Sequence, residues 1–275
     1  MFKAGKYKFP LGEKTYVMGI LNYTPDSFSD GGLFNTPAKA AEHTELMISQ
    51  GADIIDIGAN STRPGADILS SADELVRLKE VLPAVCAFDI PVSVDTFYPE
   101  CADYAISAGA SIINDIGGGF NPAMGELVKK YSCGYIMMHN PGGADAEPSY
   151  PDGVVTDVRN YLFEAVKTAV ESGIDKSFLC VDPGFGFGKT ESENLEMLRN
   201  GEWFKFSGIA LLAALSRKRF IGSVTGEKNP ACRDNATIAA NTAAIGSGAD
   251  IIRVHNVPSG LVAAQTADAI YRRKN

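Results

Sequence analysis

Short apolar runs recur along the chain, and a longer amphipathic stretch separates each run from the next. We predict a strand for each run and a helix for each stretch. The predicted strands cover residues 16–21, 53–57, 91–95, 111–115, 134–138, 178–181, 209–214 and 250–254. The predicted helices cover residues 37–50, 71–87, 98–108, 122–131, 154–172, 191–200, 233–247 and 259–272. Because every interval between strands has room for a helix, parallel strands are favoured over hairpins.

One phrase occurs three times, at residues 51–56, 109–114 and 248–253. It consists of Gly-Ala, then Asp or Ser, then two isoleucines and a polar residue. In each copy an amphipathic stretch stops at a glycine suited to a left-handed helix cap, and a β-branched strand begins at once. The phrase indicates the helix-to-strand return of a βα unit.

Eight strands alternating with eight helices fit an α/β fold, the (β/α)8 TIM barrel. A doubly wound sheet is compatible with the same local pattern. Residues 1–275 contain no low-complexity linker, and one such barrel commonly runs to about 250 residues, so we expect a single domain. Residues 1–14 precede the first strand and have room for a short hairpin that closes the barrel floor.

Polar side chains follow the apolar runs where the predicted strands end. In a barrel of parallel strands these positions meet at one rim, where such barrels place their chemistry. A single polar residue at a strand end is more often a loop cap than a catalyst, so the whole set is what predicts a site. The set comprises Asn22, Asp56, Asp95, Asn114, His139, Asp182, Ser216, Arg217, Lys218, Arg253 and His255.

The charge balance is acidic, with 33 Asp and Glu against 25 Lys and Arg and a formal net charge of −8. Such a surface repels nucleic acid and anionic membranes, so we expect neither as a partner, and an anionic substrate needs a local pocket of Arg and Lys. No apolar stretch approaches the roughly 20 residues that span a bilayer. Residues 1–12 lack the apolar segment of a signal peptide, which favours a cytoplasmic protein.

The cysteines are odd in number, and no two are spaced like a zinc or redox pair. This pattern predicts reduced thiols in the core. They are Cys86, Cys101, Cys133, Cys180 and Cys232.

Seven separated motifs carry a resemblance to a known family. Two are loops, at residues 18–32 and 56–65, and the second contains Ser61-Thr62-Arg63-Pro64-Gly65. The others are Ser93-Val94-Asp95-Thr96, Ile113-Asn114-Asp115, Asp182-Pro183-Gly184-Phe185-Gly186-Phe187-Gly188-Lys189, Ser216-Arg217-Lys218 and Ile252-Arg253-Val254-His255. In this order, and over essentially the whole chain, they resemble the dihydropteroate synthase family of pterin-binding enzymes. The resemblance implies a transferase of folate biosynthesis that joins 6-hydroxymethyl-7,8-dihydropterin diphosphate to para-aminobenzoate and releases diphosphate.

The resemblance also implies which residues hold the pterin. A pterin ring needs a carboxylate, an amide and a cation around its edge, and Asp182, Asn114 and Lys218 supply them. Asp95 is expected beside the ring. A planar guanidinium can stack while donating hydrogen bonds, so Arg253 is expected against the ring face.

The diphosphate needs positive charge and hydrogen-bond donors. Arg63, Arg253, His255 and Asn22 are the candidates, with support from the hydroxyl of Thr62. Mg²⁺ is expected to accompany the diphosphate and to take one protein oxygen, from Asn22. Such sparse ligation is normal for magnesium on a phosphate substrate and requires no carboxylate cluster.

The implied reaction is a displacement with dissociative character, in which diphosphate leaves the exocyclic methylene and the aniline nitrogen attacks. Catalysis is then mostly electrostatic. The second substrate is expected between the first two loops and Phe187, near Pro64 and Ser216. The expected catalytic residues are Asp95, Lys218, Arg253, His255 and Arg63.

Several of these positions also have an ordinary structural interpretation. His139 is as compatible with a packed, hydrogen-bonded histidine as with a substrate contact. Phe187 is as compatible with ordinary loop packing as with a substrate contact. Asp56 and Asp115 fit residues that brace the rim. Each role therefore depends on the neighbours that the fold supplies.

Lys189 follows a glycine-rich loop, but Gly184 and Gly188 are separated by three residues where a Walker motif needs four, so nucleotide binding is not expected.

The chain departs from the family pattern at two places. Gly58-Ala59-Asn60 stands where many relatives have two glycines and a glutamate, and Ala213-Ala214-Leu215 precedes Ser216 where a glycine is common. These changes bear on loop conformation and kinetics rather than on reaction class.

Two other functions stay open. A pterin-dependent methyltransferase on the same barrel expels no diphosphate and has no reason to keep Arg63, Lys218 and His255 together. A non-catalytic pterin-binding homologue would be expected to have lost the diphosphate residues, which are present here. The resemblance further suggests a homodimer and inhibition by sulfonamides.

Overall fold

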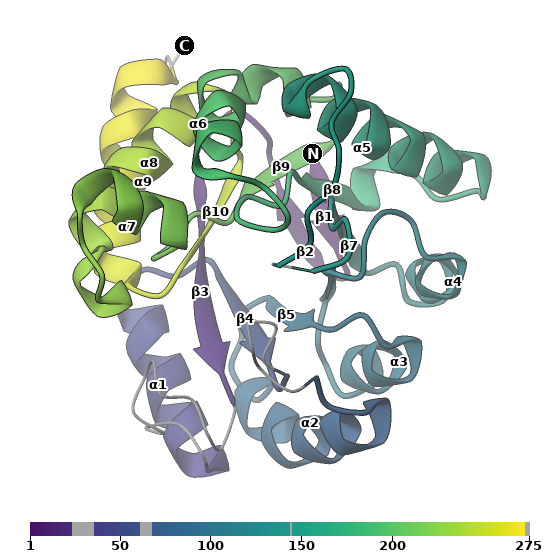
Figure 1. The fold of residues 1–275 in the computed structure, drawn as a ribbon. Helices are drawn as coiled ribbons and strands as arrows, with labels where there is room; N and C mark the ends of the chain where they lie inside the picture. Colours follow the sequence, from purple (N-terminus) through teal and green to yellow (C-terminus); the bar gives the residue numbers. More distant parts are fainter. Residues whose placement is uncertain (24–35, 61–67, 144, 273–275) are drawn as a thin grey trace.

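Eight parallel strands form a closed barrel in the computed structural model, which describes residues 1–23, 36–60, 68–143 and 145–272 (Figure 1). β10 pairs with both β3 and β9, so the sheet has no free edge between its first and last strands. This closure confirms the predicted TIM barrel and excludes the doubly wound sheet. The barrel strands are β3 (Tyr16–Asn22), β4 (Ile54–Gly58), β5 (Val92–Asp95), β6 (Ile112–Asp115), β7 (Gly134–Met138), β8 (Leu179–Asp182), β9 (Ala210–Ala213) and β10 (Ile251–Val254).

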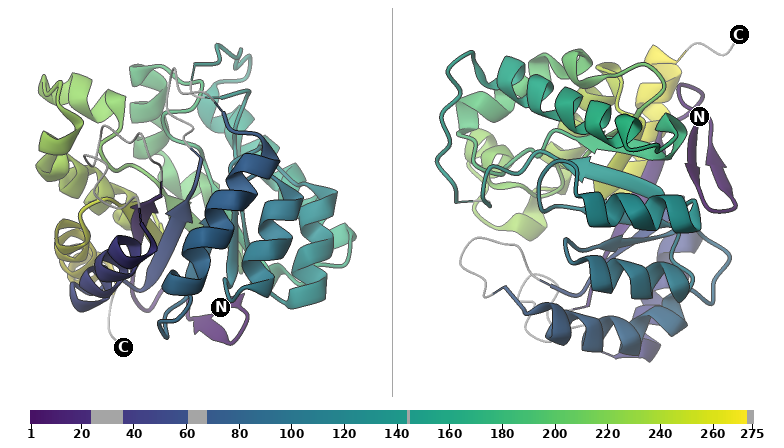
Figure 2. Two further views of the ribbon diagram at one scale, coloured as in Figure 1. Left: turned by 90° about the horizontal axis from the view of Figure 1, so that it is seen from below. Right: turned by 90° about the vertical axis from the view of Figure 1, so that its right-hand side faces the viewer.

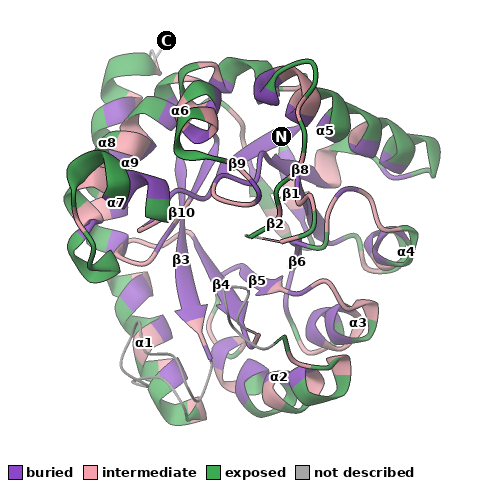
Figure 3. Ribbon diagram, in the orientation of Figure 1, coloured by how far each residue is buried: buried purple, intermediate pink, exposed green. Residues whose placement is uncertain are grey.

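Helices surround the barrel and bury one side against it (Figures 1 and 3), and the buried side chains belong to the hydrophobic core. Several begin at a side-chain cap, of which Thr190 is the most complete, because it forms a reciprocal capping box with Glu193. The helices are α1 (Pro37–Ser49), α2 (Ser71–Val85), α3 (Pro99–Ser107), α4 (Pro122–Tyr131), α5 (Val154–Glu171), α6 (Glu191–Arg199), α7 (Arg219–Thr225), α8 (Asp234–Gly246) and α9 (Val257–Tyr271). Short 3₁₀ turns lie at η1 (Lys176–Phe178), η2 (Gly201–Phe204) and η3 (Pro230–Cys232).

The repeated Gly-Ala phrase occupies the predicted helix-to-strand returns. Gly51, Gly109 and Gly248 have φ values of 97°, 116° and 103°, a region open to glycine. Each is followed within a few residues by β4, β6 or β10. The glycine cap predicted from the sequence is therefore confirmed in all three copies.

A two-stranded antiparallel hairpin, β1 (Phe2–Ala4) and β2 (Tyr7–Phe9), lies outside one end of the barrel (Figure 2). Phe2 is fully buried and Phe9 is nearly so, and both pack against the lower interior of the barrel. The hairpin thus closes the barrel floor, as predicted. The interior residues that it covers include Tyr16, Met18, Ile54, Ile112, Ile136, Cys180, Leu212 and Ile251.

Side chains alternate along each strand between the barrel interior and the helical layer, because successive residues of a strand point to opposite faces. Ile54 belongs to the interior cluster, whereas Ile55 and Ile57 pack under the helices. Asp56 and Gly58 therefore share the inward face with Ile54. The inward positions are apolar near the floor and polar near the carboxyl ends of the strands, so the sequence places a polar layer at one rim only.

The cysteines are free thiols, and three of them, Cys101, Cys133 and Cys180, are buried. Cys86 is partly buried, and Cys232 is exposed in η3, so the prediction of a core position was wrong for Cys232. A residue in a short turn between helices has no strand or helix face to bury it. Among the described residues, no helix has both the length and the apolar character needed to cross a membrane.

Candidate active site

Strand register brings the predicted polar residues side by side at the carboxyl ends of the strands, which we call the carboxyl rim. Asn22 lies opposite Gly58, Gly58 opposite Asp95, and Asp95 opposite Asn114. A Cβ at Gly58 would lie at ordinary contact distance, 3.7 Å, from Cβ of Asp95. The row joins three predicted site residues that are far apart in the sequence.

Arg253 connects the two sides of the rim. Its Nε donates to Oδ2 of Asp56 at 2.6 Å, and its Nη2 donates to Oδ2 of Asp95 at 2.8 Å. Nδ2 of Asn114 lies 3.3 Å from each carboxylate oxygen of Asp56. Asp56 is fully buried and accepts from both partners, so it orients the guanidinium and the amide together. Sequence reasoning assigned Asp56 only a bracing role. Its inward position on β4, two residues before Gly58 and in register with Ser93, was the signal for this central position.

Burial makes the ionised form of the Asp95 carboxyl unfavourable. Burial raises the pKa of Asp95 to about 7, against the opposing effect of Arg253, while Asp56 raises the pKa further. For Arg253 itself, burial works to lower the pKa, but the two carboxylates prevail and raise it. The Asp95 carboxyl therefore has a pKa near neutral pH beside a permanently charged guanidinium.

Asp182 and Lys218 are opposite charges of the rim that act on each other's pKa. Asp182 is buried, its Oδ1 accepts a hydrogen bond from the Gly184 N–H at 2.8 Å, and burial raises its pKa against the effect of Lys218. Burial lowers the pKa of Lys218 to about 8, while Asp182 and Asp95 raise it and Arg253 lowers it. Mutual electrostatic effects among Asp95, Asp182, Lys218 and Arg253 place all four in one cluster.

The glycine loop, residues 183–190 between β8 and α6, supports Lys218. Nζ of Lys218 donates to the carbonyl oxygen of Phe185 and lies 5.0 Å from the centre of the Phe187 ring. A Cβ at Gly186 would lie 3.0 Å from Cδ of Lys218, so the absence of a side chain there makes room for the lysine. The loop thus brings Phe187 to the rim together with Lys218.

Ser216 and His255 contact each other across the ends of β9 and β10. Oγ of Ser216 accepts from the backbone N–H of His255 at 3.1 Å and lies 2.9 Å from its Nδ1. Asp234 ties the same two segments together, because it accepts from Arg217 at 2.7 and 2.9 Å and from Asn256 at 2.9 Å. This pairing places His255 on the side of the rim that also carries Arg253.

Asn22 ends β3 on the inward face of the barrel, at the edge of the polar row. Among the described residues, no group of three or more His, Cys, Asp or Glu side chains could hold a metal ion by itself. A single amide oxygen at this position fits an ion carried mainly by a phosphate substrate. Thr62, Arg63 and Pro64, which the sequence assigned to the site, lie outside the described residues.

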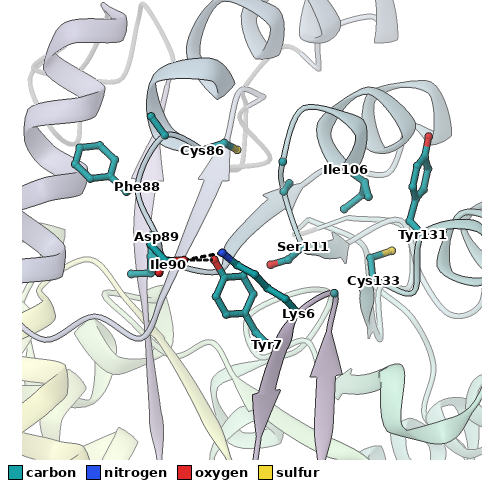
Figure 4. Close-up of a pocket in the computed structure, with 14 residues that line it drawn as sticks. Lys6, Tyr7, Cys86, Phe88, Asp89, Ile90, Ile106, Ser111, Tyr131 and Cys133 are labelled. Atoms are coloured by element: carbon teal, nitrogen blue, oxygen red, sulfur yellow. Dashed lines mark hydrogen bonds and ion pairs between the residues drawn. The ribbon is translucent and has the colours of Figure 1, made fainter.

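A separate cavity of about 460 Å³ lies at the amino ends of the strands, beside the hairpin (Figure 4). Lys6 and Asp89 form an exposed ion pair of 2.7 Å at this cavity, and Ser111, Cys86 and Cys133 also line it. These residues belong to the barrel floor, so this cavity contains none of the predicted site residues.

Comparison with known proteins agrees with this geometry. The pterin binding enzyme family matches residues 18–255. The dihydropteroate synthase of Clostridium beijerinckii is 41% identical over 274 residues, which cover 98% of this chain and 100% of that protein. The dihydropteroate synthase of Bacillus subtilis is 43% identical over 263 residues, covering 95% and 90% respectively.

Solved structures give the same result. The Clostridium difficile dihydropteroate synthase crystallised with pteroic acid has a TM-score of 0.89 at 39% identity, covering 97% of this chain and 100% of that one. The Xanthomonas albilineans enzyme with 4-aminobenzoic acid scores 0.87 at 39% identity, covering 96% and 95%. The Yersinia pestis enzyme in a sulfonamide drug complex scores 0.90 at 35% identity, covering 98% of both chains. The chain therefore belongs to the pterin binding enzyme family and, within it, to the dihydropteroate synthases.

Proposed function

We propose that residues 1–275 act as one pterin-binding domain that condenses 6-hydroxymethyl-7,8-dihydropterin diphosphate with para-aminobenzoate to give 7,8-dihydropteroate and diphosphate. The observation that carries this proposal is the convergence of Asp95, Asn114, Asp182, Lys218 and Arg253 at the carboxyl rim. A bicyclic ring with donors on one edge and a carbonyl on another needs this combination of carboxylate, amide and cation.

Asp182 accepts from the amino-pyrimidine edge of the pterin in this proposal, while Asn114 and Lys218 bind the remaining edge. Asp182 already uses one oxygen for the Gly184 N–H, which leaves its second oxygen available to accept from the ring. Lys218, held from below by the Phe185 carbonyl, has further N–H bonds for the pterin carbonyl. The buried position of these groups makes each hydrogen bond to the ring more valuable than it would be in water.

The leaving diphosphate is bound in this proposal by Arg253, His255 and Asn22, with Arg63 and Thr62 from the second loop. The donor set fits Mg²⁺ brought in by the diphosphate, since Asn22 offers one neutral oxygen and the described rim has no carboxylate cage. When bound, the ion supplies charge neutralisation on the leaving group. His255 is oriented toward this role through its contact with Ser216.

Bond breaking places positive character on the exocyclic methylene, and ionised Asp95 lies where it can stabilise that charge. The positive charge of Arg253 would repel the developing charge on the methylene if no anion were bound to it. Binding of the departing diphosphate to Arg253 removes this repulsion, so Asp95 and Arg253 together favour the departure of diphosphate from the methylene. The aniline nitrogen then forms the new C–N bond with the methylene and gives its proton to the released diphosphate or to solvent. The groups act mainly by electrostatics, and no covalent bond to the protein is needed.

Para-aminobenzoate occupies a slot beside Phe187 and Ser216, with Pro64 on its other side, in this proposal. The relatives crystallised with 4-aminobenzoic acid or a sulfonamide drug support a slot for an aromatic amine. A sulfonamide should therefore raise the KM for para-aminobenzoate without changing the maximal rate. Inhibition that is non-competitive toward para-aminobenzoate would contradict this placement.

Diphosphate release tests the proposed reaction. Purified protein is given the pterin diphosphate and Mg²⁺, with and without para-aminobenzoate, and both diphosphate and dihydropteroate are measured. Equal amounts of the two products, dependent on para-aminobenzoate, are expected. Methyl transfer to a corrinoid, or pterin binding without diphosphate release, would instead support a methyltransferase or a non-catalytic homologue.

We also propose a homodimer, formed through α8 and α9. These helices have one charged residue each, Asp234 and Asp268, and each is paired within the chain, with Arg217 and Arg272 respectively. α9 nevertheless exposes large apolar side chains, Val262, Ile270 and Tyr271. An uncharged helical face with exposed apolar groups is typical of an interface that a second copy covers.

A further inference from the structure

The ammonium of Lys189 makes three hydrogen bonds at once. Nζ lies 2.9 Å from the carbonyl oxygens of both Gly184 and Phe187, and 3.0 Å from Nδ1 of His139. An ammonium has three N–H bonds, so these acceptors use its whole donor capacity. Nδ1 of His139 must then accept, which leaves that ring neutral with its proton on Nε2; burial, aided by the charge of Lys189, lowers the pKa of His139 to about 3.

Side chains hold the glycine loop in a shape that its own backbone favours weakly. Gly184, Gly186 and Gly188 have φ values of 69°, 78° and 55°, a backbone conformation that residues with a side chain rarely adopt. A Cβ at Gly184 would collide with the carbonyl oxygen of His139, so the loop lies directly on the end of β7. Asn194 fixes the far side of the loop by accepting from the Gly186 N–H at 2.7 Å.

The loop in turn fixes a residue of the carboxyl rim. Phe185 provides the carbonyl that accepts from Lys218, and Phe187 places its ring beneath the same ammonium. Lys189 spans the segment that carries both phenylalanines, because it bonds to the carbonyls of residues 184 and 187. Its charge also acts directly on the rim, where it lowers the pKa of Asp182.

We propose that Lys189 is a positioning residue, whose ammonium sets the glycine loop so that Phe187 and the Phe185 carbonyl hold Lys218 in its substrate-binding orientation. This inference rests on the proposed function. It adds a residue that acts through others, since its donors are used within the protein rather than offered to a ligand. Burial lowers the pKa of Lys189 to about 7 together with the charge of Lys218, against the opposing charges of Asp182 and Glu193. The three acceptors around Nζ favour the ammonium.

Steady-state kinetics of Lys189→Met test this role. Methionine keeps an unbranched side chain of similar length but offers no donor, so the loop loses its common anchor. We expect the KM values for both substrates to rise about tenfold, the effect of losing roughly one net hydrogen bond at the loop. A role in stability alone would lower the melting temperature and the active fraction but leave both KM values unchanged. Lys167→Met, at an exposed lysine paired with Glu164 on α5, is the matched control and should change nothing.

Rescue by a small amine tests the same role from the opposite direction. Lys189→Ala lacks the atoms of propylammonium, so propylammonium should restore both KM values toward wild type, whereas tetramethylammonium at equal ionic strength should not. If Lys189→Met does not fold, Lys189→Gln, with two N–H donors, takes its place.

Two outcomes distinguish the proposed function from the positioning role. If the wild-type protein forms no dihydropteroate, both the proposed function and this inference are refuted. Wild-type turnover together with unchanged KM values in the variants would refute the positioning role alone.

Discussion

At the scale of single residues, Arg253 links the rim, because its guanidinium donates to both Asp56 and Asp95. The sequence placed Asp95, Asn114, Asp182 and Arg253 at strand ends, and the register brings them to one rim. The partners of Arg253 could not be predicted, because Asp56 and Asp95 are 197 and 158 residues away from it in the chain. Which residues pair across a barrel depends on strand tilt and side-chain length. The local sequence pattern does not predict the strand tilt.

Removing the guanidinium of Arg253 should leave the buried carboxylate of Asp56 and the partly buried carboxylate of Asp95 without their cation. We expect Arg253→Met to lower the free energy of unfolding by about 3 kcal/mol, the cost of breaking a buried pair. Because Asp56→Asn removes one of the stranded charges, the double variant should lose less stability than the sum of the two single variants. Urea denaturation of the four proteins gives this coupling. Strictly additive losses would show that Arg253 and Asp56 do not depend on each other.

The raised pKa of Asp95 predicts a specific pH dependence of stability. The folded carboxyl holds its proton up to about pH 7, whereas the unfolded one ionises near its usual value of 3.8. Between these values the folded state binds more protons, so stability is highest below the lower value and falls as pH rises, by at most about 1.4 kcal/mol per pH unit. The Asp95→Asn variant has no carboxyl group at this position, so its stability does not fall with pH for this reason. Its stability relative to wild type should therefore increase from pH 4 to 7 and then stay constant; a difference independent of pH would contradict the shift.

At the scale of elements, hydrophobic periodicity predicted every barrel strand and eight of the helices to within a few residues. It missed α7 (Arg219–Thr225), which begins directly after Lys218 and is followed by its C-cap Gly226, with φ 72°. Seven residues are too few to show a helical period, so the local sequence gave no signal.

Asn60 is one of the positions where the chain departs from the family pattern. Its side chain donates a hydrogen bond to Glu74 and accepts one from the Leu69 N–H. The sequence could not predict these two contacts, because they depend on the position of α2.

The floor hairpin provides a test at this scale. Phe2 is fully buried against the lower barrel, so Phe2→Ala should lower the free energy of unfolding by about 3–5 kcal/mol, the usual cost of such a cavity. The KM values should hardly change, because the hairpin lies at the end of the barrel away from the carboxyl rim. Phe163→Ala, at a residue 46% exposed on α5, is the control and should cost under about 0.5 kcal/mol. An unchanged unfolding midpoint for Phe2→Ala would mean that the hairpin does not stabilise the barrel.

At the scale of the whole molecule, closure of the barrel is what turns separate strand ends into one site. Alternating strands and helices are compatible with a barrel or with a doubly wound sheet, because the choice depends on whether the first and last strands pair. Here Ile251 and Tyr16 pair in register, although they stand at opposite ends of the fold in sequence. The seven motifs identified the family, and with it the barrel, where local pattern left both folds open.

Association through α8 and α9 predicts a concentration-dependent mass. Wild-type protein should sediment as a dimer, and Val262→Glu should shift it to the monomer because it places a charge at the centre of an apolar face. Val224→Glu, at an equally exposed valine on α7, is the control for an added surface charge. A monomeric wild type, or a dimer that Val262→Glu does not weaken, would place the interface elsewhere or remove it.

A crystal structure with the pterin diphosphate, or with a pterin that cannot react, tests the central claim most directly. The ring should lie at the carboxyl rim with its edge on Asp182, Asn114 and Lys218, and with Asp95 and Arg253 beside it. Arg253 should release at least one of its carboxylate partners to meet the diphosphate. A pterin bound at the floor cavity near Lys6, or on the outer helices, with the rim residues still paired only to one another, would contradict the account.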